Sequence, residues 1–295
     1  MLAKIVSSYL LGKGVISKEQ NDSLFKELSR ARAKLGLIAV HEGYLTEVQA
    51  NTINVLQASM DKRFGDIAVE KGFLTDAQVG ELLAKQGEPY LALAQAFENL
   101  KIMDINDLNS ALEDFIKEKN LPASALEDLK SDDIDRIVPL FVPEGQDEYL
   151  EIAKLAVKTI MRCVENNVAV DKACITSSLD IDNVSVQHVE ADKSLTTLFA
   201  GRADALLYMA SVFGQEEFGS VDEDALDAVA ELINCINGMY ASSMSEKGIS
   251  MELLPPELYA EAKTVTGKGF MVMPLYIKDD TVYLIFSIGD KPELR

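Results

Sequence analysis

The chain has 295 residues, of which 48% are apolar, so it is long enough for two domains with buried cores. Its formal net charge is −20 at pH 7. Residues 1–120 carry 14 basic and 17 acidic side chains, a balance of −3, whereas residues 121–295 carry 14 and 31, a balance of −17. The acidic second half is expected to repel nucleic acid and anionic membrane, and no apolar run reaches the length of a membrane span. We therefore expect neither nucleic-acid binding nor membrane insertion.

The cysteines and histidines indicate neither disulfide bonds nor a metal site. Cys163, Cys174 and Cys235 are scattered in apolar surroundings, which is typical of buried free thiols in a reducing cytoplasm. His41 and His188 stand alone in the sequence, so they favour structural roles over zinc ligation or a histidine-based catalytic triad. We therefore expect a cytoplasmic protein without a bound metal of its own.

Residues 1–120 contain a repeat with a period of 29, seen at 14–20, 43–49 and 72–78, with a worn copy at 101–107. Each of the first three copies has Ser or Thr three residues before Gln, which is the capping box that begins a helix. A glycine three residues before the hydroxyl suits the left-handed residue that ends the preceding helix. The pattern predicts an all-α array of four 29-residue units over residues 1–120, each unit made of two helices.

The two middle units share a second pattern, in which a cation opens the motif, two glycines follow and a glutamine closes it. This paired pattern resembles the MshEN-type N-terminal domain of type II secretion ATPases, which binds cyclic di-GMP through Arg-Leu-Gly…Gly…Gln motifs. The resemblance implies a cyclic di-GMP site at Lys34, Leu35, Gly36, Gly43, Gln57, Arg63, Gly65, Gly72 and Gln86. In this chain Lys34 replaces the first arginine and Phe64 replaces a leucine. Lysine cannot form the bidentate contact with phosphate that arginine forms. A helical repeat that docks a protein is the alternative that these departures favour.

The pattern changes between residues 121 and 145, where Pro122 and Pro143 bracket a charged segment that could form one short helix over 124–141. We expect a linker there and a separate domain over 146–295. Its predicted elements are a helix over 149–164, strands over 168–176, 184–190 and 195–200, helices over 203–213 and from Asp222, and a hairpin of 270–277 with 282–288. This order predicts an α+β domain with an antiparallel sheet and helices over one face. Pro274 inside a β-like run indicates an edge strand or a bulge.

The predicted helix from Asp222 carries its polar residues on one stripe. Asp227, Glu231, Asn234 and Gly238 follow at i, i+4, i+7 and i+11, which places them on one side of the helix. The opposite side is apolar, with Leu226, Val229, Ile233, Ile236, Tyr240 and Met244. The helix is therefore expected to bury one face and to present a carboxylate, a carboxamide and a bare glycine to an approaching partner.

This stripe resembles the [Asp/Ser]-x-x-x-Glu-x-x-Asn signature of the CheC/CheX/FliY phosphatases, which dephosphorylate the chemotaxis response regulator CheY. The order of elements over residues 148–290, with a single motif helix, is similar to that of CheX. The resemblance implies that Asn234 orients the attacking water, that Glu231 pairs with a lysine of the regulator, and that Asp227 and Gly238 contribute to docking. It also implies that Mg²⁺ is supplied by the partner, that this chain needs no cofactor of its own, and that a homodimer can form.

The charge pattern agrees with a lysine-bearing partner, because residues 203–246 contain nine Asp and Glu and neither Lys nor Arg. The leading hypothesis is a phosphatase of a phosphorylated CheY-type regulator, with the N-terminal repeats as a targeting or regulatory module. The alternative is a non-catalytic motility or chemotaxis adaptor whose repeats bind a protein or cyclic di-GMP. The Glu231 and Asn234 pair separates the two hypotheses, since an adaptor has no chemical need for it.

Overall fold

The computed structural model describes residues 1–60, 62–261, 263–278 and 280–295. The chain forms two compact units, one made of Leu2 and residues 6–132, the other of Met1, residues 3–5 and residues 133–295. The first unit is helical, and the second combines helices with an antiparallel sheet. The predicted fold class, a helical N-terminal region followed by an α+β region with an antiparallel sheet, is therefore confirmed. No helix in the described ranges is both long and apolar enough to cross a lipid bilayer.

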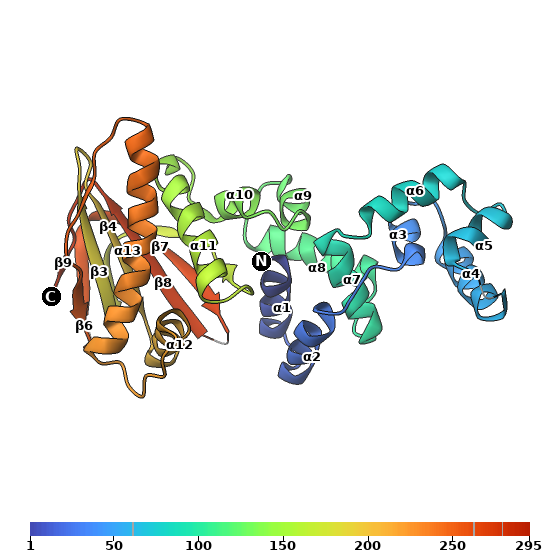
Figure 1. Ribbon diagram of the computed structural model, residues 1–295, viewed down its shortest axis with the longest axis horizontal. Coiled ribbons are helices and arrows are strands. Elements are labelled where there is room, and N and C mark those ends of the chain that lie inside the picture. The colour runs from blue at the N-terminus through green and yellow to red at the C-terminus, as the bar shows by residue number, and fades with distance from the viewer. Residues whose placement is uncertain (61, 262, 279) are drawn as a thin grey trace. The chain divides into compact units, whose positions relative to one another are not determined.

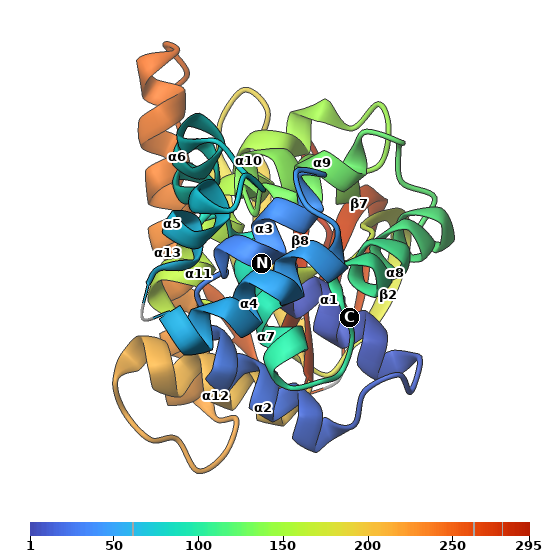
Figure 2. The same ribbon diagram turned by 90° about the vertical axis from the view of Figure 1, so that its right-hand side faces the viewer.

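The N-terminal unit contains helix pairs that follow the 29-residue period, and Figure 2 labels their eight helices, α1 to α8. The pairs are α1 (Leu2–Gly12) with α2 (Lys18–Leu28), α3 (Leu35–His41) with α4 (Glu47–Met60), α5 (Phe64–Glu70) with α6 (Asp76–Lys85), and α7 (Pro89–Asn99) with α8 (Ile105–Glu118). Capping boxes begin α2 and α6, where Ser17 and Thr75 bond reciprocally with the glutamines three residues later. Each unit of the repeat is thus a helix, a turn and a capped second helix.

The turn inside each pair depends on one residue in the left-handed region. Gly14, Gly43 and Gly72 have φ values of +69°, +71° and +73°. The fourth copy places Lys101 at the corresponding position, with a φ of +56°. A side chain in this region costs free energy that glycine avoids. The worn fourth copy therefore keeps the backbone geometry of the repeat without the residue best suited to it.

The charged segment after α8 is divided into several short helical pieces. They are α9 (Ala125–Lys130), α10 (Ile134–Ile137) and two 3₁₀ turns, η1 (Val138–Phe141) and η2 (Asp147–Tyr149). The expectation of one helix over 124–141 is wrong because Asp132 takes a left-handed φ of +53° and interrupts the helical path. Asp133 then caps α10 by accepting a hydrogen bond from the backbone N–H of Asp135.

The second unit is built on an antiparallel sheet with the path β1-β7-β8-β4-β3-β5. The strands are β1 (Ala169–Val170), β2 (Cys174–Ile181), β3 (Asn183–Glu190), β4 (Leu195–Gly201), β5 (Glu252–Leu253), β6 (Glu257–Tyr259), β7 (Lys263–Ile277), β8 (Asp280–Ile288) and β9 (Glu293–Leu294). β2 and β9 also pair with β7, and β6 pairs with β3. The hairpin expected over 270–288 is the β7–β8 pair, which runs from Met271 opposite Phe286 to Ile277 opposite Asp280.

Pro274 lies in the interior of the sheet, not on an edge strand, because β7 has β8 on one side and β1 and β2 on the other. The carbonyl of Pro274 accepts a 2.9 Å hydrogen bond from the backbone N–H of Asp171, in the gap between β1 and β2. The N–H and C=O of a strand residue point to the same side, so the N–H that proline lacks would point into that gap. The proline thus explains why the single strand expected over 168–176 is split in two.

Two helices cover one face of the sheet, as Figure 1 shows for α13 beside β3. α12 (Ala203–Gly214) packs on β4 and β8, and α13 (Glu223–Glu246) packs on β3, β4 and the short strands β5 and β6. α11 (Leu150–Cys163) packs against α13. The other face of the sheet carries a buried apolar cluster to which Val186, Leu198 and Ile285 belong, together with Val265 and Ile181 from the paired ends of β7 and β2. β3 is consequently buried on both faces, and its α13-facing side positions the site.

Candidate functional site

Asp222, from which the sequence predicts the motif helix, is the N-cap residue of α13. The Asp222 carboxylate accepts a 3.1 Å hydrogen bond from the backbone N–H of Ala225 and another from the Ser220 hydroxyl. These bonds lower the pKa of Asp222 below its usual value, and the bond from Ala225 has the largest effect. The helix then runs for 24 residues to Glu246, and Gly248 in the left-handed region follows it. A helix of this length carries the whole polar stripe on one rigid element.

The stripe and the apolar face lie on different sides of α13. Asp227 and Glu231 are exposed, and Asn234 and Gly238 are half-buried. The six apolar residues predicted to face the core are all buried: Leu226, Val229, Ile233, Ile236, Tyr240 and Met244. The two side chains with the strongest chemical implication, Glu231 and Asn234, are three residues apart and hence neighbours on the helix surface.

Asn234 differs from the other stripe residues because its carboxamide is held by the sheet. Its Oδ1 accepts a 2.9 Å hydrogen bond from Nε2 of Gln187 on β3. Gln187 is not among the site residues predicted from the sequence. The available signal was the alternation of Ser185 and Gln187 with Val184 and Val186, which places the two polar residues on one face of the strand. Ser185 is also bonded to α13, since its hydroxyl donates to the carbonyl of Leu226 over 2.7 Å.

Gly238 leaves the surface of α13 open one turn beyond Asn234. A methyl group built at its Cα position would meet no heavy atom of the protein within 4 Å. Packing within the described fold therefore does not require glycine at this position. A glycine that the fold does not need, in the middle of a helix, is consistent with close approach by another molecule.

The cysteines are more exposed than their sequence surroundings indicate. Cys174 and Cys235 are exposed, and Cys163 is half-buried, so the expectation of buried thiols is wrong. Cys235 falls outside the apolar spacing of α13, and Cys174 lies in β2, whose residues are mostly exposed. Partial burial, followed by the charge of Glu231, raises the pKa of the Cys235 thiol. A thiol with a raised pKa is mostly protonated at neutral pH and is a weak nucleophile.

His188 has a structural environment in the second unit. Its Nδ1 lies 2.9 Å from Oγ1 of Thr196, and its Nε2 lies 3.6 Å from a carboxylate oxygen of Glu257. Burial and then Lys291 lower the pKa of His188, although Glu257 opposes this shift. His188 is therefore a neutral, buried histidine near pH 7. Within the described ranges there is no group of three His, Cys, Asp or Glu side chains that could hold a metal ion.

In the repeat, the predicted glycines have structural explanations. Gly36 in α3 is buried against the ring of Phe64, 3.2 Å from where its Cβ would lie, and a Cβ on Gly65 would lie 2.9 Å from Val79. Gly43 and Gly72 are the left-handed turn residues described above. These four positions are thus accounted for by helix packing and turn geometry.

The polar members of the repeat motif are placed less uniformly. Lys34 and Arg63 are the residues immediately before α3 and α5, with similar extended backbones, and both are exposed. Arg63 pairs with Asp66 at 3.0 Å. Gln86 is half-buried and donates to the carbonyl of Ala33 over 2.7 Å, whereas its counterpart Gln57 is exposed. Leu35 is half-buried. The two cations are therefore equivalent in position, and the two glutamines are not.

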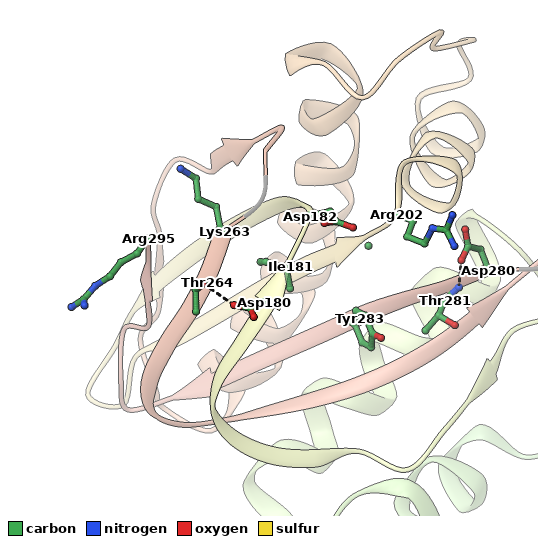
Figure 3. A pocket seen from close by; sticks show the side chains of 11 residues that line it. Asp180, Ile181, Asp182, Arg202, Lys263, Thr264, Asp280, Thr281, Tyr283 and Arg295 are labelled. Carbon is green, nitrogen blue, oxygen red and sulfur yellow. Dashed lines mark hydrogen bonds between the residues drawn. The ribbon is translucent and has the colours of Figure 1, made fainter.

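A further pocket, which the sequence analysis did not predict, lies away from the α13 stripe. It has a volume of about 490 Å³ and is lined by residues of β2, β4, β7, β8 and the C-terminus (Figure 3). Several of its polar groups have partners within the chain. Thr264 donates to Asp180, Lys263 pairs with Glu261, and Arg295 pairs with Glu293. The pocket is therefore a polar surface hollow in which two of the cations are paired with neighbouring glutamates.

Comparison with known families identifies the region that holds the stripe. The model of the family described as "Chemotaxis phosphatase CheX" matches residues 184–274. Residues 184–274 form a CheX domain. This region begins on β3, three residues before Gln187, contains all of α13, and ends at Pro274 in β7. Glu231 and Asn234 therefore lie inside the CheX domain. No curated protein matches the chain in a sequence search.

Solved structures resemble about half of the chain. A CheC-like superfamily protein from Shewanella sp. PV-4 is 16% identical, with a TM-score of 0.43, and the alignment covers 49% of this chain and 98% of that one. A chemotaxis protein CheX from Desulfovibrio desulfuricans is 15% identical, with a TM-score of 0.41, and the alignment covers 47% of this chain and 99% of that one. A chain of the CheX–CheY–BeF₃–Mg²⁺ complex from Borrelia burgdorferi is 17% identical, with a TM-score of 0.39, and the alignment covers 48% of this chain and 97% of that one.

Proposed function

We propose that this chain accelerates the loss of phosphate from a phosphorylated CheY-type response regulator. The aspartyl phosphate of such a regulator hydrolyses by itself, with Mg²⁺ and a lysine that the regulator supplies. A phosphatase therefore need only hold an attacking water in line and stabilise that arrangement. The observation that carries the proposal is the Glu231 and Asn234 pair on α13 within the region that matches the CheX model, with Glu231 exposed and Asn234 half-buried beside β3.

Each residue of the stripe has a role in this proposal. Asn234 enters the active site of the regulator and orients the water, because a carboxamide donates and accepts hydrogen bonds without a charge that would repel the phosphoryl group. Glu231 pairs with the lysine of the regulator and fixes the docking position. Asp227 and Gly238 belong to the docking surface. The acidic residues of 203–246 favour encounter with a partner that presents lysines.

The test is the rate of phosphate loss from a phosphorylated CheY-type regulator of the same cell, with the full chain and with its Asn234→Ala and Glu231→Ala variants. We expect acceleration by the native chain and a loss on the order of 100-fold or more in kcat/KM for each variant. Glu144→Ala is the matched control for charge, since Glu144 is exposed between η1 and η2 and lies outside the acidic segment. An unchanged regulator lifetime in the presence of the native chain would reject the enzyme and leave the adaptor hypothesis.

The N-terminal repeats would act as a targeting or regulatory module of this phosphatase. The equivalent positions of Lys34 and Arg63 before α3 and α5 support cyclic di-GMP as one candidate for their ligand. Isothermal titration of the full chain with cyclic di-GMP tests this. Binding that is lost in an Arg63→Ala variant is the expected result, and absence of binding heat would leave a protein as the partner of the repeats.

A further inference from the structure

A chain of buried polar side chains connects Asn234 to the interior of the second unit. Nε2 of Gln187 donates to Oδ1 of Asn234 over 2.9 Å and to the carbonyl of Leu254 over 3.1 Å. Oε1 of Gln187 accepts a 2.9 Å bond from Nδ2 of Asn237, and Oδ1 of Asn237 accepts a 2.7 Å bond from Thr197. Gln187 and Asn237 are only 2% and 1% exposed. Water is therefore largely excluded from this network, and its bonds are correspondingly strong.

The carbonyl of Leu254 determines the direction of every bond in this network. A backbone carbonyl can only accept a hydrogen bond, so the Gln187 atom that faces it must be the amide nitrogen, Nε2. The same nitrogen faces Asn234, which must then present its oxygen. On the other side, the oxygen of Gln187 faces Asn237, which must present its nitrogen. The orientation of the Asn234 carboxamide thus follows from the position of one backbone group.

We infer that Gln187 is a positioning residue, which holds the Asn234 carboxamide in the one orientation that places the attacking water in line with the phosphoryl group. This inference rests on the proposed function. One lone pair of Asn234 Oδ1 is used by Gln187. The two Nδ2 protons and the second lone pair remain for the water and the phosphoryl oxygens. Without Gln187 the carboxamide would rotate and exchange its donor and acceptor ends, so only a fraction of encounters would place the water correctly.

The segment after α13 belongs to the same hydrogen-bond network. Leu254 follows β5 and precedes Pro255, and its backbone N–H donates to the carbonyl of His188 over 2.9 Å. The carbonyl that orients Gln187 is therefore fixed to β3 by a backbone bond of its own residue. β3, α13 and the β5 segment meet at Gln187, which makes this side chain the junction between the sheet and the motif helix.

The experiment compares kcat and KM of the full chain with those of a Gln187→Met variant, which keeps the length of the side chain and removes its hydrogen bonds. We expect kcat to fall by about tenfold to 100-fold, while KM for the regulator stays within about twofold of the native value, because the docking surface is unchanged. Gln187→Leu serves as a second variant if Gln187→Met does not fold, since leucine is also apolar and cannot bond to Asn234.

The matched control is Ser185→Ala. Ser185 lies two residues away on the same strand and is buried, and it bonds to α13 at Leu226 without touching Asn234. This variant removes one bond between sheet and helix, so it should lower the melting temperature and leave kcat within about twofold. If the Ser185 and Gln187 variants lose kcat equally, or if the Gln187 variants raise KM and keep kcat, the positioning role is overturned.

A second readout is independent of activity. The side-chain NH₂ signals of Asn234 are assigned by their absence in an Asn234→Asp variant, and their order parameters are measured by NMR in the free protein. We expect a rigid carboxamide in the native chain and in Ser185→Ala, and a mobile one in the Gln187 variants. Equal mobility in all forms overturns the inference. A native chain that is inactive but shows the expected mobility change rejects the proposed function and retains the structural role of Gln187.

Discussion

Asn237 accepts a 2.7 Å hydrogen bond from the hydroxyl of Thr197, across the buried interface between α13 and β4. Asn234 lies only three residues earlier on the same helix, and its carboxamide is at the boundary with solvent. The two asparagines are less than one helical turn apart but differ in environment, because Asn237 faces the sheet and Asn234 lies at its border with solvent. The buried Asn237 helps to fix the orientation of the half-buried Asn234 through Gln187.

The open surface at Gly238 gives the first prediction. A Gly238→Ala variant should be more stable by roughly 0.5–1 kcal/mol, because alanine favours a helix interior and meets no atom of the protein. Gly238→Arg should also fold, but its bulk and positive charge should raise KM for a lysine-bearing regulator by about tenfold or more. Thermal denaturation and phosphatase kinetics measure the two effects. Native KM in the Gly238→Arg variant would contradict a docking role for this position.

The second prediction concerns ionic strength. The segment 203–246 has nine acidic and no basic residues, so encounter with a basic patch should weaken as salt screens the attraction. We expect kcat/KM to fall on the order of tenfold between about 0.05 M and 0.5 M NaCl, mainly through KM. An Asp224→Asn/Asp227→Asn double variant should show a shallower dependence. A rate that is independent of salt in the native chain would contradict electrostatic steering.

The third prediction is a pH dependence of stability. Burial lowers the pKa of His188 in the folded chain, so the unfolded chain, with a histidine pKa of about 6.5, binds the proton first. The stabilising contribution is complete above the unfolded value and is lost as the pH falls towards the folded value. Melting temperature measured from pH 7.5 to 5 should therefore fall more steeply in the native chain than in a His188→Gln variant. Parallel curves would show that His188 does not contribute.

The fourth prediction concerns the left-handed Lys101 in the fourth repeat. Replacing it with glycine should stabilise the chain by about 1 kcal/mol, because a side chain is disfavoured at a φ of +56°. The reverse exchange, Gly72→Lys, should destabilise by a similar amount at the corresponding position of the third repeat. Urea denaturation of both variants checks this. Destabilisation by Lys101→Gly would mean that the Lys101 side chain makes a contribution larger than its backbone cost.

The local pattern of the sequence determined much of the architecture. The 29-residue period, the capping boxes and the glycines predicted the helix pairs, because capping and left-handed turns depend on residues a few positions apart. The spacing of apolar residues predicted the buried face of α13 in the same way. Single residues divide two predicted elements, since Asp132 interrupts the helix expected over 124–141 and Pro274 lies opposite the break in the strand expected over 168–176.

Only the tertiary structure decided what surrounds the predicted stripe. Neither the partner of Asn234 nor the carbonyl that orients this partner could be read from the chain. Gln187 and Leu254 are 47 and 20 positions away from Asn234, and they bond to each other beside it only when β3, α13 and β5 pack together. The exposure of Cys235 also depends on which side of α13 the sheet covers. Local spacing fixes which residues share a helix face, and the sheet register fixes which buried groups lie beneath it.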